Sequence, residues 1–212
     1  MMPTLNSDLH GNAPDKSAVV LLLIDVINDF DFPEADQLHR YAAPMATAIA
    51  GLKQRCRTAG IPAIYVNDNF HRWRSDFRSL IEHCRSESRL GGPIVELLHP
   101  EPDDYFVLKP KHSGFFSTTL ETLLTYLEAE TLILTGMAAN ICVLFTANDA
   151  YMRDYHLVVP GDCVASNTAA ENEYALRQMQ QIVKADTRPS TELCLEQLLQ
   201  SGPERTTPRP EA

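Results

Sequence analysis

Three residues with reactive side chains stand at or just beyond the ends of short apolar runs. Asp25 closes VVLLLID, Lys109 closes YFVLK, and Cys142 follows TLILTG across the turn MAAN. If these runs are parallel strands of one open sheet, their carboxyl ends border a common crevice. A carboxylate, an ammonium and a thiol in that crevice could form an activated nucleophile, because the acid can accept the thiol proton. The sequence therefore offers a nucleophilic site, provided that the three strands are neighbours.

Cys142 has two interpretations. The segment that follows the turn, ICVLFTANDAYM, is typical of a helix whose first turn contains Cys142. The positive end of the helix dipole would lower the pKa of that thiol, and the free N–H groups of the first turn could hold an oxyanion. Cysteine is also a small residue that is often buried in cores. Its position alone therefore leaves a structural role open.

Asp25 and Lys109 could also have roles other than catalysis. Asp25 follows an unbroken aliphatic run, so its carboxylate should be partly buried and in need of a partner; it could instead cap the next helix. Lys109 and Lys111 would face the same side of a strand, and lysine pairs are usually solvated. Pro110 ends the hydrogen-bond ladder, which favours Lys109 as the residue at the strand end.

Apolar runs of strand length alternate with stretches of helical periodicity, which is typical of an α/β fold with a mainly parallel sheet. The expected strands cover residues 19–25, 62–68, 105–109, 131–136 and 156–162, with a weaker sixth at 181–186. The expected helices cover residues 73–88, 117–128, about 166–183 and about 189–200. These elements predict a three-layer α/β/α domain with a six-stranded, Rossmann-like sheet. We expect this domain to span residues 18–200 between loose tails at 1–17 and 201–212.

The composition narrows the possible partners. The chain has 212 residues, with 28 Asp and Glu against 18 Lys and Arg, and its formal net charge of −10 argues against a nucleic-acid surface. The longest apolar stretch, residues 19–24, is too short to cross a membrane, and no signal-peptide pattern precedes it. We therefore expect neither a nucleic-acid partner nor a membrane partner.

The cysteines indicate a reducing compartment. There are five, an odd number, and none forms a C-x-x-C pair, so they fit neither a disulfide framework nor a zinc site. The cytoplasm is the expected location. Four of them lack the context of Cys142, and we expect these to be structural: Cys56, Cys84, Cys163 and Cys194.

Four motifs in order, IDVINDF, LKPKHSGFFSTTL, LTGMAANICVLFTANDAY and GDCVAS, resemble the isochorismatase-like cysteine hydrolase superfamily. The resemblance runs from about Val19 to about Asp186. This superfamily includes nicotinamidases, N-carbamoyl amidohydrolases, ureidoacrylate and biuret hydrolases, and isochorismatase. The resemblance implies a catalytic triad of Asp25, Lys109 and Cys142, and so favours Lys109 over Lys111. It also implies a small-molecule substrate, no cofactor, and a homo-oligomer that is a dimer or larger.

The resemblance further implies a non-proline cis peptide bond between Met137 and Ala138. The backbone N–H groups of Ala138 and Cys142 would then form an oxyanion hole. In the mechanism that it implies, Asp25 takes the proton of Cys142 and the thiolate attacks a carbonyl carbon to form a thioester.

One departure from the resemblance concerns metal binding. Similar nicotinamidases carry Asp-x-His and a further His as ligands of a divalent metal after the second strand. Here that stretch is NDNFHRWRSDF, in which Asp68 and His71 are three residues apart and no Asp-x-His occurs. Ile27 stands where many relatives have glutamine. We therefore expect no catalytic metal, and nicotinamidase activity is disfavoured.

The loop after the second strand is basic and aromatic. Arg72 could bind an anionic group of the substrate and Trp73 could cover a planar one; alternatively, the segment is a solvated helix face with Trp73 packed inward. The candidate pocket residues are Phe30, Asn67, Asp68, His71, Arg72, Trp73 and Phe115.

Three functions compete. The first is a metal-free cysteine hydrolase that cleaves a C–N bond of a small amide, ureido, carbamoyl or imide compound. The second is vinyl-ether hydrolysis of isochorismate, but relatives that do this often lack the nucleophilic cysteine, so Cys142 counts against it. The third is a catalytically silent binding or assembly protein. All three triad positions are filled, which counts against it, because a silent relative would be expected to have lost one.

Overall fold

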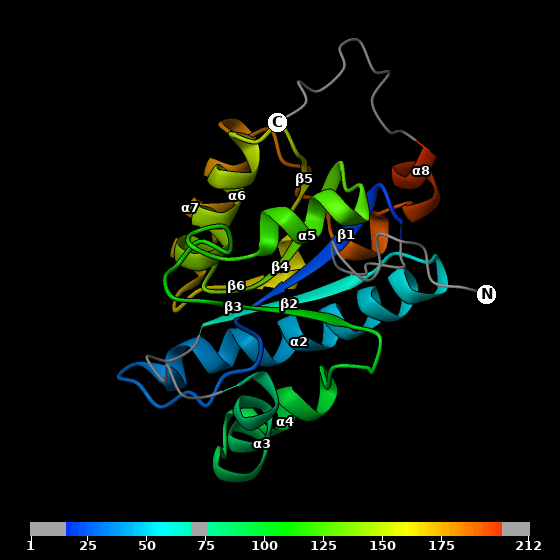
Figure 1. Cartoon of the computed structure of the whole chain (residues 1–212). Coiled ribbons are helices and arrows are strands. Elements are labelled where there is room, and N and C mark those ends of the chain that lie inside the picture. The colour runs from blue at the N-terminus through cyan, green and yellow to red at the C-terminus, as the bar shows by residue number, and fades with distance from the viewer. Residues whose placement is uncertain (1–15, 69–75, 201–212) are drawn as a thin grey trace, which may run out of the picture.

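The computed structural model describes residues 16–68 and 76–200 (Figure 1). The strands are β1 (Val19–Ile24), β2 (Ala63–Asp68), β3 (Tyr105–Lys109), β4 (Thr131–Met137), β5 (His156–Val158) and β6 (Val164–Ala165). The α-helices are α2 (Ala35–Thr58), α3 (Phe77–Glu87), α4 (Gly91–Leu97), α5 (Leu120–Leu127), α6 (Leu144–Tyr151), α7 (Ala169–Gln181) and α8 (Leu195–Gln200). Short turns of π- or 3₁₀-helix are η1 (Ala139–Val143), η2 (Gly161–Cys163) and η3 (Ser190–Glu192).

The strands form one six-stranded parallel sheet. Its order is β3-β2-β1-β4-β5, and β6 pairs with the end of β4. β1 is central, and all six of its residues are buried. The carboxyl ends of the central strands are level, because Ile24 pairs with Val66 on one side and with Gly136 on the other. The residues that follow β1, β2 and β4 therefore meet at one edge of the sheet.

Helices cover both faces of the sheet, which gives three layers. Alternate residues of β1 enter two separate hydrophobic clusters: Leu21 and Leu23 pack in the cluster that contains α2, while Leu22 and Ile24 pack in the cluster with α5, α6 and α7. Figure 1 shows α2, α3 and α4 on one side of the sheet and α5, α6 and α7 on the other. The predicted α/β/α architecture with six strands is confirmed.

Two element predictions were wrong. The sixth strand is Val164–Ala165 and not residues 181–186, because α7 continues to Gln181 and only Asp186 makes an isolated bridge, to Val158. A strand of two residues is too short to show any periodicity. The last helix begins at Leu195, after a 3₁₀ turn at Ser190–Glu192, and not near residue 189.

The expected tails lie almost entirely outside the described residues. Ser17, at the end of the first of them, is buried, and its N–H donates to the carbonyl oxygen of Leu127 at 2.9 Å. In the ranges 16–68 and 76–200, none of the helices combines the length and apolarity that a membrane crossing requires.

Candidate active site

Asp25, Lys109 and Cys142 come together at the carboxyl edge of the sheet. The Nζ atom of Lys109 lies 2.8 Å from Oδ2 of Asp25 and 3.5 Å from Sγ of Cys142. The side chain of Lys109 has no solvent-exposed area, and that of Asp25 is 8% exposed. Lys111, the alternative lysine, is exposed. The buried ammonium therefore joins the carboxylate and the thiol.

The backbone around Asp25 is held from two sides. Asp25 has a φ of 53°, in the left-handed region, and its N–H donates to the carbonyl oxygen of Val66 at 3.0 Å. Its Oδ1 atom accepts a 2.7 Å hydrogen bond from the N–H of Asp68. The carboxylate is thus fixed by β2 through Asp68 and by β3 through Lys109, which leaves little freedom for it to turn away.

Asp68 adds a second carboxylate at the site. Its Oδ2 atom lies 3.8 Å from Nζ of Lys109, and its side chain is 29% exposed. A divalent cation bound to this carboxylate would stand beside the Lys109 ammonium and be repelled by it. Within residues 16–68 and 76–200, no three His, Cys, Asp or Glu side chains are grouped so that they could hold a metal ion. His71 and the rest of the stretch after Asp68, residues 69–75, lie outside the described residues.

The turn that carries Cys142 is supported by two hydroxyl groups. The peptide bond between Met137 and Ala138 is cis, and residues Ala139–Val143 form one turn of π-helix before α6 begins. The Ser166 hydroxyl accepts from the N–H of Asn140 at 3.3 Å. The Thr146 hydroxyl donates to the carbonyl oxygen of Cys142 at 2.7 Å. Both supports were missed from the sequence, because their partners are backbone groups that a sequence pattern does not specify.

The charges around the thiol shift its pKa in the direction opposite to our expectation. Burial, and then the negative charge of Asp25, raise the pKa of Cys142 above its ordinary value of 9.0, although Lys109 pulls it down. We predicted a lowered pKa from a helix dipole, and that prediction was wrong. The thiol is partly buried beside a carboxylate, and burial and that negative charge are the two largest influences on its pKa.

The pKa values of Asp25 and Lys109 are shifted as well. Burial raises the pKa of Asp25 above 3.8, against the attraction of Lys109. Burial alone would lower the pKa of Lys109, but the attraction of Asp25, Cys142 and Asp68 outweighs it and raises this pKa above 10.5. The pKa values of the carboxyl, the ammonium and the thiol are thus all raised. A carboxylate of raised pKa is a stronger acceptor for a thiol proton than an ordinary one.

A family comparison agrees with this geometry. The model of the Isochorismatase domain matches residues 19–187, which include all three side chains. The chain belongs to the isochorismatase family. This confirms the resemblance that the sequence motifs indicated.

Three similar proteins match this chain over different lengths. The uncharacterized isochorismatase family protein YaaI of Bacillus subtilis is 42% identical over 171 residues, which cover 81% of this chain and 93% of YaaI. The ureidoacrylate amidohydrolase RutB of Methylorubrum extorquens is 39% identical over 88 residues, 41% of this chain and 36% of RutB. The crystal structure of N-carbamoylsarcosine amidase from Thermoplasma acidophilum aligns with a TM-score of 0.62 and 25% identity, over 82% of this chain and 98% of that one.

Two candidate pocket residues are occupied by structural contacts. Asn67 is fully buried, and its side-chain amide donates to the carbonyl oxygen of Ile27 at 2.6 Å and accepts from the N–H of Ile27 at 3.4 Å. Phe115 is 6% exposed, and its ring packs against Tyr155 and beneath the Arg153 guanidinium. Asn67 therefore holds the loop after β1, and the contacts of Phe115 account for its burial. The candidates His71, Arg72 and Trp73 lie outside the described residues.

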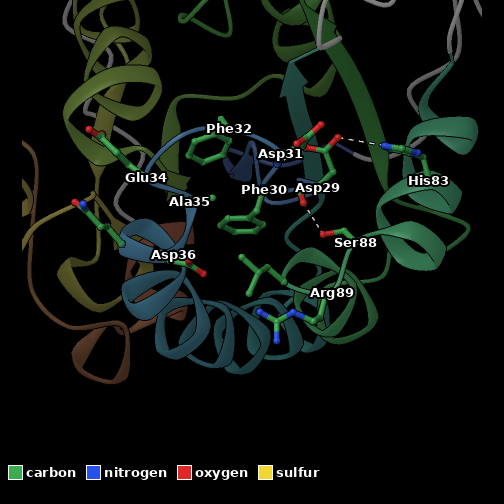
Figure 2. A pocket seen from close by; sticks show the side chains of 12 residues that line it. Asp29, Phe30, Asp31, Phe32, Glu34, Ala35, Asp36, His83, Ser88 and Arg89 are labelled. Carbon is green, nitrogen blue, oxygen red and sulfur yellow. Dashed lines mark hydrogen bonds and ion pairs between the residues drawn. The ribbon is translucent and has the colours of Figure 1, made fainter.

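Phe30 lines a cavity of about 730 Å³, shown in Figure 2. Among the described residues that line it, Nε2 of His83 lies 3.2 Å from Oδ2 of Asp29, and the Ser88 hydroxyl donates to the backbone oxygen of Asp29. Phe32 forms another part of the wall. None of the triad residues is in the lining. His83 gave no signal in the sequence, because it occupies a polar position of an ordinary amphipathic helix.

Proposed function

We propose that this isochorismatase-family chain is a cysteine hydrolase that cleaves a C–N bond of a small amide, ureido, carbamoyl or imide compound. The observation that supports the proposal most is the position of Lys109, whose buried ammonium contacts both the Asp25 carboxylate and the Cys142 thiol. A buried lysine between an acid and a thiol is costly for a scaffold to maintain. It is useful to an enzyme that must move a proton and stabilise a thiolate.

In the first half of the reaction, Asp25 accepts the proton of Cys142 and Lys109 stabilises the thiolate. The sulfur attacks the carbonyl carbon, and the carbonyl oxygen becomes an oxyanion held by the N–H groups of Ala138 and Cys142. As the C–N bond breaks, protonated Asp25 gives its proton to the departing nitrogen. Ammonia or an amine leaves, and the acyl group remains as a thioester on Cys142.

In the second half, Asp25 is again a carboxylate and removes a proton from a water molecule. The resulting hydroxide attacks the thioester carbon, the C–S bond breaks, and the acid product leaves. The thiolate recovers its proton from Asp25. The cycle needs no cofactor and no metal, and each proton that Asp25 accepts is returned within the same half-reaction.

Two similar proteins support the class of substrate. RutB is named as an amidohydrolase of ureidoacrylate, and the Thermoplasma structure is that of an amidase of N-carbamoylsarcosine. Both substrates carry a carbonyl carbon bonded to nitrogen, which is the group that the proposed thiolate attacks. Vinyl-ether hydrolysis and a silent binding role are less well supported, because neither requires the Cys142 thiol beside Lys109.

The proposal is tested on a panel of small amides, N-carbamoyl amino acids and ureidoacrylate, from which ammonia release is measured. Cyclic imides and isochorismate are followed by loss of the starting compound, because opening an imide ring keeps the nitrogen in the product and isochorismate contains no nitrogen. We expect ammonia from at least one C–N compound, and loss of that activity in Cys142→Ala. Cys194→Ser is the matched control, because Cys194 is the exposed free cysteine among the described residues; its activity should remain unchanged. Turnover of isochorismate alone, or full activity of Cys142→Ala, would contradict the proposal.

A further inference from the structure

The loop after Lys109 is tied to the helix after Cys142 by the side chain of Thr146. The Thr146 hydroxyl donates to the carbonyl oxygen of Cys142 at 2.7 Å and accepts from the N–H of Gly114 at 3.0 Å. Thr146 has no exposed area. The buried hydroxyl oxygen of Thr146 thus joins Cys142 to Gly114, which lies five positions after Lys109.

Only one of these two bonds is usual for a helical threonine. A threonine hydroxyl in a helix commonly donates to the carbonyl oxygen four residues earlier, as Thr125 does to Glu121 at 2.9 Å. The bond from Gly114 is different, because it comes from another element and fills the acceptor position of the same oxygen. Removal of the hydroxyl would leave the buried N–H of Gly114 without the acceptor that it has here, which costs about 1–3 kcal/mol.

The backbone of Gly114 packs closely against two neighbouring side chains. A Cβ atom on Gly114 would lie 2.9 Å from Cγ1 of Val66 and 3.1 Å from Cδ2 of Leu120. The backbone of Gly114 is therefore pressed between β2 and α5 while its N–H is bound by Thr146. A second bridge runs beside it, since the Ser113 hydroxyl donates to Asp149 of α6.

We propose that Thr146 is a positioning residue that sets the distance between the Lys109 ammonium and the Cys142 thiol. This inference rests on the proposed function, since it assigns a role in the same site. Gly114 lies in the loop that follows Lys109, the last residue of β3, and Thr146 lies in α6, four residues after Cys142. The Thr146 hydroxyl therefore fixes this loop relative to the turn that carries Cys142. The attraction between ammonium and thiolate changes with their separation, and displacements of about 1 Å have large effects on catalysis.

The test compares Thr146→Val, which keeps the shape and removes the hydroxyl, with Thr146→Ser, which restores it. Each is made in a Cys194→Ser background, and the rate of Cys142 alkylation by iodoacetamide is measured at several pH values from 6 to 8.5, below the raised pKa of the thiol, where the rate follows the thiolate fraction. Thr135→Val is the matched control, because Thr135 is equally buried and its hydroxyl donates to a backbone oxygen, that of Leu22 at 2.8 Å, without contact to the Cys142 turn. Thermal unfolding of each variant is recorded in parallel.

We expect alkylation of Thr146→Val to be about tenfold slower at each pH, because a weaker attraction from Lys109 raises the pKa of the thiol and lowers its thiolate fraction. Thr146→Ser should return to within about twofold of the parent protein, and Thr135→Val should lose stability without a change in the alkylation rate. An unchanged alkylation rate in a folded Thr146→Val protein would overturn the inference. If the parent protein releases no ammonia and Cys142→Ala changes nothing, the proposed function fails instead, so the two failures are distinguishable.

Discussion

The α-carbon of Gly136 faces the backbone of Ile24 so closely that a Cβ atom there would stand 2.0 Å from the Ile24 carbonyl oxygen. Gly136 also has a φ of 111°, which L side chains rarely adopt. Glycine at this point allows the end of β4 to lie directly against the end of β1. Asp25 follows one strand and the Cys142 turn follows the other, so this contact brings the acid and the thiol into one site.

Gly136→Ala should therefore be strongly destabilising. The added methyl group overlaps with backbone, which cannot rotate away as a flexible side chain can, so we expect a loss of about 3 kcal/mol or more in the free energy of unfolding. Gly51→Ala is the control, because Gly51 lies inside α2 with nothing within 4 Å of an added Cβ; it should stabilise the helix by up to about 1 kcal/mol. Chemical denaturation measures both, and equal effects would contradict the close approach of the two strands.

Lys109→Met should destabilise the protein at neutral pH. It removes the ion-pair partner of a buried Asp25, and breaking a buried pair costs about 3–5 kcal/mol. The folded-state pKa of Lys109 is raised above 10.5, so its contribution is fully present below pH 10.5 and is lost as the pH rises through the folded-state pKa. Lys111→Met, an exposed neighbour, should stay within about 0.5 kcal/mol of the parent. A similar loss of stability in Lys109→Met and Lys111→Met would show that loss of the ion pair does not cause the destabilisation.

The pH dependence of turnover should show the raised pKa of Asp25. Asp25 must be ionised to accept the thiol proton, and burial raises its pKa above 3.8. With an uncharged amide substrate, kcat/KM should therefore fall on the acid side with a midpoint above 3.8. A midpoint at or below that value would mean that the attraction of Lys109 dominates over burial.

Asp25→Asn should separate turnover from thiol reactivity. The charge of Asp25 raises the pKa of Cys142, so its removal leaves Lys109 free to stabilise the thiolate. We expect iodoacetamide to alkylate Cys142 faster at neutral pH, while turnover falls by about 10² to 10⁴ because no group delivers the proton to the leaving nitrogen. Slower alkylation together with slower turnover would point to a collapsed site instead, and thermal unfolding of the variant would reveal it.

The sequence predicted that Asp25, Lys109 and Cys142 would meet, because they close or follow strands and parallel strands end at a common edge. It did not predict the residues that fix their distances. Thr146 and Ser166 act through backbone partners from distant segments, and the left-handed conformation of Asp25 has no sequence signal. The pKa of Cys142 was predicted in the wrong direction, because its position in a helix could be inferred whereas its burial beside Asp25 could not.

The cavity of Figure 2 illustrates the same limit. Phe30 was a candidate pocket residue because it follows the IDVIND motif, and it does line the cavity. Its neighbour in the wall, His83, comes from a helix more than fifty residues later and is brought there by its pairing with Asp29. Sequence patterns locate groups along strands and helices, but side-chain pairing between segments depends on how those elements pack.

The central claim is that Cys142 carries the acyl group during turnover. The direct measurement is the intact mass of the protein after rapid acid quench, taken with the member of the substrate panel that releases ammonia fastest, followed by peptide mapping. We predict a thioester adduct on Cys142, absent in Cys142→Ala and still present in Cys194→Ser. Ammonia release by the parent protein without any adduct on Cys142, together with undiminished activity of Cys142→Ala, would contradict the account.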